Sequence, residues 1–76
     1  MNFEAEVRGV YRDSELLPMK AVSRITSLSR ATIYRRIAEG TFPKAINLGG
    51  RRIAFARREV DRWIADPVAY HQDPKT

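Results

Sequence analysis

Two short helical patterns separated by only three residues are the feature that most limits how this chain can fold. In the first pattern, apolar side chains recur at helical spacing, and Pro18 suits a first turn because its missing N–H costs nothing there. The pattern predicts a helix over about residues 18–26, with apolar positions at Met19, Val22 and Ile25. Only Ser27, Leu28 and Ser29 separate it from the next pattern, so the sequence predicts two helices joined by a tight turn.

The second pattern predicts a helix from Arg30 to Glu39. Ser29 is a good N-cap because its hydroxyl can accept from an unpaired backbone N–H, and Gly40 can adopt the left-handed conformation that ends helices. At 3.6 residues per turn, the core side holds Ile33 and Ile37, and the opposite side holds Ala31, Arg35 and Ala38. We therefore expect Arg35 to project into solvent.

A hairpin is predicted next, because Gly49-Gly50 separates two strand-like stretches at residues 44–48 and 51–55. If the two glycines form the whole loop, Ile46 faces Ile53 and Leu48 faces Arg51. One apolar face would then cover the helices, made of Ile46, Leu48, Ile53 and Phe55. The other face would hold Ala45, Asn47, Arg52 and Ala54.

A third helix is predicted over about Arg57–Ala65, with a buried stripe of Val60, Trp63 and Ile64. Ala56 is a poor N-cap, and Asp66-Pro67 ends the helix. The resulting order predicts a mainly α fold with a small β-hairpin, a winged helix-turn-helix over residues 16–65. Residues 1–15 are expected to form a flexible or loosely packed N-terminal arm, and residues 66–76 a frayed or irregular C-terminal tail.

Positive charge is concentrated in the middle of the chain. The net charge is +5 over all 76 residues, yet residues 16–65 carry eleven Lys or Arg against three carboxylates, a net of +8 between two mildly acidic ends. Such a concentration favours a polyanionic partner, since neutralising phosphates releases their counterions. A solvated surface is the alternative interpretation.

The residues needed for catalysis or for cofactor binding are missing. The chain has no Cys and one His, His71, in the expected tail, so it offers no thiolate and no multi-ligand metal site. Glu59 and Asp61 are two residues apart on a helix and diverge, and Gly49-Gly50 lacks the spacing of a nucleotide-binding loop. We expect no enzymatic activity, no cofactor and no small-molecule substrate. No apolar run approaches the roughly 20 residues that span a bilayer, and the N-terminus does not resemble a signal peptide, so we expect a cytoplasmic protein without membrane contact.

The second helix and the hairpin tip are the candidate contacts to double-stranded DNA. Arg35, between two small alanines, matches guanine O6 and N7 in the major groove, whereas Arg30, Tyr34 and Arg36 on the flanks suit phosphates. Thr32 suits either, and Ser29 and Ala31 complete the helical set. At the hairpin tip, Gly49, Gly50, Arg51 and Arg52 suit backbone or minor-groove contacts. In the alternative interpretation these charges are only solvated. Trp63 is assigned to the core rather than to base stacking.

Four segments in order, Leu28–Arg35, Glu39–Lys44, Leu48-Gly49 and Glu59–Ile64, together resemble the AlpA family of small phage and prophage regulators. The resemblance covers about residues 16–65 and implies a MerR-like or excisionase-like winged helix. It implies that the helix starting near Ser29 is the recognition helix and that Gly49–Arg52 is the wing. The sequence departs from the family at Ser27, where Gly is frequent, and at Ala56, where a polar residue is frequent.

The resemblance implies either of two outputs, a transcriptional regulator or a recombination directionality factor that promotes excision of an integrated element. Double-stranded DNA is the expected partner, together with an integrase or recombinase or further copies of the chain on DNA. The expected location is the nucleoid of a prokaryotic host. The competing hypothesis is a protein-interaction module whose basic face docks an acidic partner such as an integrase.

Overall fold

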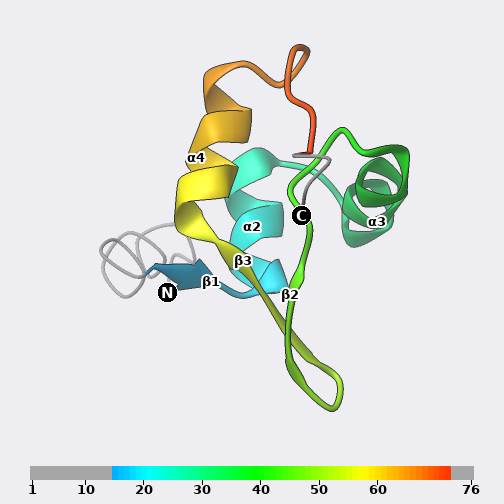
Figure 1. The fold of residues 1–76 in the computed structure, drawn as a ribbon, viewed down its shortest axis with the longest axis vertical. Helices are drawn as coiled ribbons and strands as arrows, with labels where there is room; N and C mark the ends of the chain where they lie inside the picture. The colour runs from blue at the N-terminus through cyan, green and yellow to red at the C-terminus, as the bar shows by residue number, and fades with distance from the viewer. Residues whose placement is uncertain (1–14, 73–76) are drawn as a thin grey trace.

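The computed structural model describes residues 15–72, so nearly all of the expected N-terminal arm and the last four residues lie outside the described residues. The elements, in chain order, are β1 (Leu16–Leu17), α2 (Met19–Thr26), α3 (Arg30–Glu39), β2 (Ile46–Gly49), β3 (Arg52–Ala56) and α4 (Arg57–Ala65) (Figure 1). The predicted fold class, mainly α with a small hairpin in the order of a winged helix-turn-helix, is confirmed.

The tight turn between α2 and α3 is held by side chains rather than by glycine. Ser27 ends α2 in the left-handed conformation, with φ +62°. The Ser23 hydroxyl donates to the Leu28 carbonyl at 2.6 Å, and the Leu28 N–H donates to the Thr26 hydroxyl at 3.3 Å. These bonds give partners to the backbone carbonyl and N–H of Leu28, so the turn keeps its geometry with a serine in the left-handed conformation.

Local signals set both ends of α3 as predicted. The Ser29 hydroxyl accepts from the Thr32 N–H at 3.1 Å, and Gly40 has φ +80°. The Gly40 and Thr41 N–H groups donate to the carbonyls of Ile37 and Arg36. This is a glycine-type helix end, which pairs carbonyls that would otherwise lack a partner.

The sheet has a third strand that the sequence did not predict. The strand order is β1-β3-β2, and Leu16 and Leu17 of β1 pair antiparallel with Ala56 and Phe55 of β3. As predicted, Ala56 provides no side-chain cap for α4. Instead the Arg57 N–H donates to the carbonyl of Glu15, just before β1, at 2.8 Å. The two-residue strand β1 thus adds an edge to the sheet, and the residue before it supplies a hydrogen-bond acceptor for the start of α4.

The predicted hairpin register is wrong by one residue. Ile46 pairs with Ala54 and Asn47 with Ile53, and the ladder is irregular between Asn47 and Gly49. The cause is local: the Asn47 side-chain carbonyl accepts from the Gly49 N–H at 2.8 Å, and Gly49 pairs with Arg52, so the loop is not the two glycines alone.

The register shift moves the β2 residues to the opposite face, while Ile53 and Phe55 of β3 stay on the core side as predicted. Ile46 and Leu48, expected against the helices, are exposed by 39% and 49%. Ala45 packs against the core instead, beside Ile53 and the fully buried Phe55. The expectation that Ile46, Leu48, Ile53 and Phe55 share one apolar face, opposite Ala45, Asn47, Arg52 and Ala54, is therefore correct for Ile53 and Phe55. It is wrong for Ile46, Leu48 and Ala45.

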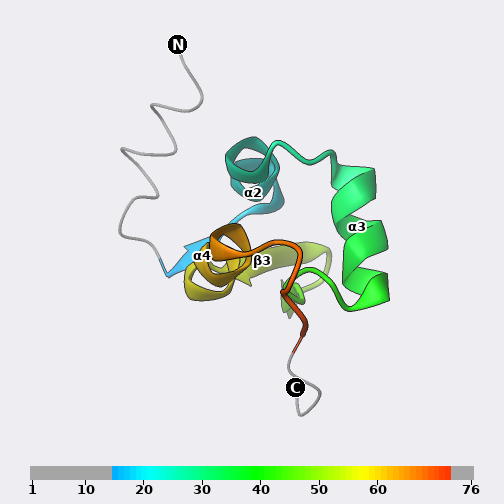
Figure 2. The same ribbon diagram turned by 90° about the horizontal axis from the view of Figure 1, so that it is seen from above.

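The core lies between the sheet and the three helices (Figure 2). Phe42 is at its centre, with ring centroids 6.0 Å from Phe55 and 5.0 Å from Trp63. Trp63 is buried, as predicted, and its indole N–H donates to the Thr41 carbonyl at 3.1 Å. Ile25 and Ile64, both assigned to apolar stripes, are 39% and 43% exposed because the helices bury a narrower face than the stripes suggested.

The described part of the expected tail is irregular but not frayed. Asp66–Gln72, which we call the C-terminal strap, turns back onto the domain, and Tyr70 belongs to the core with 5% exposure. The Tyr70 hydroxyl donates to Glu59 at 3.1 Å. Burial, and secondly the bond to Glu59, raise the pKa of Tyr70 above its ordinary value. One buried aromatic thus fixes a segment whose composition suggested disorder.

Candidate nucleic-acid interface

The outward side of α3 is accessible along its length. Six of its residues are exposed: Arg30, Ala31, Tyr34, Arg35, Ala38 and Glu39. Ile33 and Ile37, on the other side, are buried and partly buried against the core. The two small alanines leave the helix surface low around Arg35, so a flat or grooved partner can approach the backbone closely.

Arg35 makes only a weak intrahelical ion pair. Its guanidinium is 3.8 Å from the Glu39 carboxylate, and the two side chains are 62% and 50% exposed. Exposed i,i+4 pairs contribute about 0.3–0.5 kcal/mol, so a bidentate acceptor can replace Glu39 at small cost. Arg30 lies 5.8 Å from the Tyr34 ring centroid, which gathers these two side chains on one flank.

Three of the predicted contact residues of α3 are engaged or enclosed within the fold: Ser29, Thr32 and Arg36. Ser29 caps the helix, and its hydroxyl also donates to the Thr32 hydroxyl at 2.9 Å. Arg36 is half-buried, and its Nε is enclosed with no hydrogen-bond partner within residues 15–72. Arg36 is therefore less accessible than the six exposed residues of α3.

The hairpin tip is exposed at all four predicted residues, Gly49, Gly50, Arg51 and Arg52. Gly49 and Gly50 have φ of +106° and +59°, which side chains with a Cβ rarely adopt. No carboxylate in the described range pairs with Arg51 or Arg52. The turn thus extends two arginines beyond the body of the molecule on a backbone that glycine makes possible.

The helix and the hairpin tip lie on the same side of the molecule. Figure 1 shows α3 at the right and the tip at the bottom, both away from β1 and α4, and Figure 2 shows α3 across the molecule from β1 and α4. We call the exposed residues of α3 together with Gly49–Arg52 the α3–wing face. Its side chains are cationic, small or aromatic, with one carboxylate, Glu39, at its end.

Sequence analysis missed two further cations near this face. Lys20 and Arg24 of α2 line a shallow hollow with Met19, Ser23 and Arg30. Their i,i+4 spacing on a predicted helix was the signal that could have found them, because such residues share one side of a helix. They extend the positive charge from α3 toward α2.

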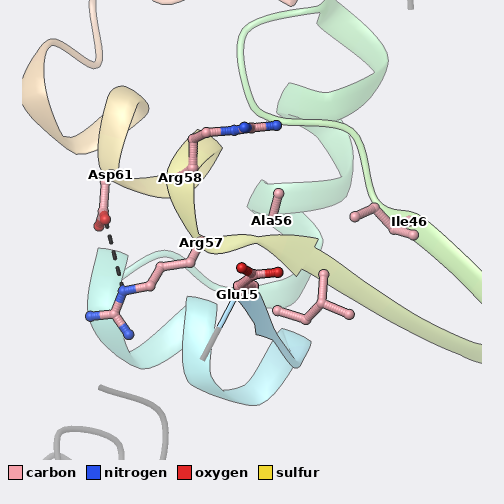
Figure 3. A pocket seen from close by; sticks show the side chains of 7 residues that line it. Glu15, Ile46, Ala56, Arg57, Arg58 and Asp61 are labelled. Atoms are coloured by element: carbon pink, nitrogen blue, oxygen red, sulfur yellow. Dashed lines mark ion pairs between the residues drawn. The ribbon is translucent and has the colours of Figure 1, made fainter. Parts of the chain in front are cut away.

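A second hollow, on the outer side of the sheet, has a different character. Its apolar floor is formed by Leu16, Ile46 and Ala56, and Figure 3 shows Arg58 extending above it and Glu15 below. Arg57 pairs with Asp61 at 3.8 Å beside it. Because both signs of charge line this hollow, it does not fit a polyanion as the α3–wing face does.

Two further observations limit the chemistry of the described residues. Within residues 15–72, no cluster of three His, Cys, Asp or Glu side chains could coordinate a metal ion. In the same range, no helix has both the length and the apolar character needed to cross a membrane.

Comparisons with known proteins point to one family. A family model described as "Prophage CP4-57 regulatory protein (AlpA)" matches residues 15–68. A protein of Enterobacteria phage P4, "Uncharacterized protein ORF88", is 40% identical over 53 residues, which cover 70% of this chain. The chain matches 60% of the length of that relative. None of the solved structures gives a significant match.

Proposed function

Because this chain belongs to the AlpA family of prophage regulatory proteins, we propose that it binds double-stranded DNA sequence-specifically through the α3–wing face. One observation carries the proposal: an exposed helix and a glycine turn, both carrying arginines, lie on one side of the fold. An α-helix fits the major groove, and a hairpin beside it reaches the adjoining backbone or minor groove.

The proposed contacts divide into base readout and backbone binding. Arg35 reads guanine, because its guanidinium matches O6 and N7 and the flanking alanines permit close approach. Arg30 and Tyr34 bind phosphate from the flank of α3, with Thr32 near either. Arg36 reaches phosphate only if its half-buried side chain rearranges.

Two groups support the main contacts. Ser29 and Ala31 contribute the start of the helix, where backbone N–H groups favour an anion. Arg51 and Arg52, carried by Gly49-Gly50, bind backbone or a narrow minor groove. None of these contacts needs a cofactor or performs a chemical step on the DNA.

The biological output that we propose is control of a mobile element in a prokaryotic cell. The chain acts either as an excisionase, a recombination directionality factor, or as an AlpA-type transcriptional regulator, at the nucleoid in the cytoplasm. A single domain of this size covers little DNA, so an integrase or further copies bound to adjacent sites would raise its affinity.

Titration of duplex DNA at several salt concentrations tests the binding proposal. We expect log K to fall linearly with log salt, because phosphate contacts release counterions. Selection of bound duplexes from a random pool then identifies the site, and its position at an attachment site or a promoter separates excision from transcription control. No binding, or binding without salt dependence, would contradict the proposal.

Capture of a protein partner separates the competing hypothesis. If Arg35→Ala leaves duplex binding intact but abolishes binding of an acidic partner such as an integrase, the α3–wing face is a protein-docking surface instead. Arg58→Ala, on α4, is the matched control because it removes an exposed arginine from another side of the fold.

A further inference from the structure

We propose that the C-terminal strap positions α3 for duplex DNA and that Gln72 is its positioning residue. The inference rests on the proposed function, since it concerns how accurately the α3–wing face is held. The family model ends at residue 68, so Tyr70 and Gln72 lie beyond the matched region.

Gln72 joins three carbonyl groups at the end of α3 and in the connection that follows. Its side-chain amide donates to the Ile37 carbonyl at 3.0 Å and to the Phe42 carbonyl at 2.7 Å. Its backbone N–H donates to the Gly40 carbonyl at 3.0 Å. The Ile37 carbonyl already accepts from the Gly40 N–H, so Gln72 adds a second donor there and links it to the carbonyls of Gly40 and Phe42 in the connection that follows α3.

The strap is itself fastened to α4, so Gln72 is not a loose end. Tyr70 is buried in the core and its hydroxyl bonds to Glu59. Arg62 lies 4.8 Å from the Tyr70 ring centroid and donates to the His71 carbonyl at 3.2 Å. A continuous set of contacts therefore runs from α4 through Tyr70 and His71 to Gln72 and the end of α3.

The two ends of α3 are held by different kinds of contact. The start of α3 is held by the Ser29 cap and by the turn from α2, both local in sequence. Its C-terminal end is tied to α4 by a residue more than 30 positions away. Arg35 lies one turn before that end, so its direction depends on both fastenings.

The two kinds of DNA contact respond differently to a shift of α3. A bidentate bond from Arg35 to a base is strongly directional, so displacement of the helix end weakens it. Phosphate contacts from the wing depend mainly on charge and tolerate such a shift. Loss of the Gln72 contacts should lower selectivity while leaving the salt dependence of binding unchanged.

The test compares Gln72→Ala with His71→Ala, both in the full chain. His71 is exposed and the strap uses only its backbone carbonyl, so its variant is the matched control. Binding to a duplex selected by the wild-type chain and to a random duplex is measured well below the unfolding temperature of each variant. Amide hydrogen exchange at Gly40 and Thr41 reports the end of α3, and exchange at Val22 reports α2.

We expect Gln72→Ala to bind the selected duplex about fivefold more weakly, in the range that loss of a hydrogen bond gives, with random-duplex binding and salt slope unchanged. Exchange at Gly40 and Thr41 should accelerate by a similar factor, and exchange at Val22 should not. An unchanged selectivity ratio, or an equal loss on both duplexes, would overturn the role of Gln72. A wild-type chain that selects no duplex would instead overturn the proposed function itself.

Discussion

The wing arginines, Arg51 and Arg52, and Arg62 of α4 are in contrasting chemical settings. Arg51 and Arg52 extend from the wing with no carboxylate partner among residues 15–72. Arg62 on α4 binds Glu59 at 3.0 Å and stacks on Tyr70. One set is presented to solvent, and the other holds the C-terminal strap on the domain. The comparison shows that the number of basic residues alone does not reveal their role. Whether an arginine can bind a partner or stabilises the fold depends on the side chains that it contacts.

The largest expected effect tests whether α4 is needed for the stability of the core. Trp63→Ala should lower the free energy of unfolding by about 3–5 kcal/mol, because it removes the Phe42 contact and the bond to the Thr41 carbonyl. Denaturant unfolding followed by circular dichroism measures the loss. A loss below about 1 kcal/mol would show that α4 is not an essential part of the core.

A matched pair of arginine variants tests the contrast directly. Arg35→Ala should weaken binding to the selected duplex by about 1–3 kcal/mol and relax its sequence preference, with little change in stability. Arg62→Ala should mainly lower stability, by about 1 kcal/mol, through the lost contacts to Glu59 and Tyr70. It should weaken duplex binding less than Arg35→Ala, because Arg62 acts on α3 only through the C-terminal strap. Binding and unfolding are measured on both. The contrast fails if the two variants behave alike.

A variant of the wing tests whether base readout belongs to α3 and backbone binding to the wing. Arg51→Ala should weaken selected and random duplexes equally, by less than Arg35→Ala, and should reduce the salt slope by about one unit. Titrations of both duplexes across a salt series provide the measurement. A selective loss on one sequence would place base readout in the wing as well.

The smallest expected effect concerns the turn between α2 and α3. Ser27→Gly should raise the free energy of unfolding by about 0.5–1 kcal/mol, since φ of +62° strains a residue with a Cβ. Duplex affinity should stay the same, because Ser27 is outside the α3–wing face. A decrease in stability would indicate that the serine makes a compensating contact.

Sequence reasoning succeeded where the determinants are close in the chain. Ser29, Gly40 and Asp66 set helix ends through their own side chains or backbone, so the bounds of α3 and α4 were predictable. The exposure of Ala31, Arg35 and Ala38 followed from helical geometry alone. Whether these residues bind DNA stays a prediction.

It failed where a distant or competing partner decides the outcome. The Asn47 side chain takes the Gly49 amide and shifts the hairpin, which strand alternation cannot reveal. The carbonyl of Glu15 pairs with the start of α4, and Gln72 pairs with the end of α3, across more than 30 residues in each case. Such long-range pairings depend on the assembled fold rather than on any local pattern.

The bond from the Trp63 indole to the Thr41 carbonyl has a practical consequence. The chain has a single tryptophan, so its tryptophan fluorescence comes from one site, beside the connection between α3 and β2. Its wavelength and quenching will follow displacements of that connection in the unlabelled protein. Trp63 is therefore an intrinsic fluorescence probe for movement of α3, the helix that we propose to bind DNA.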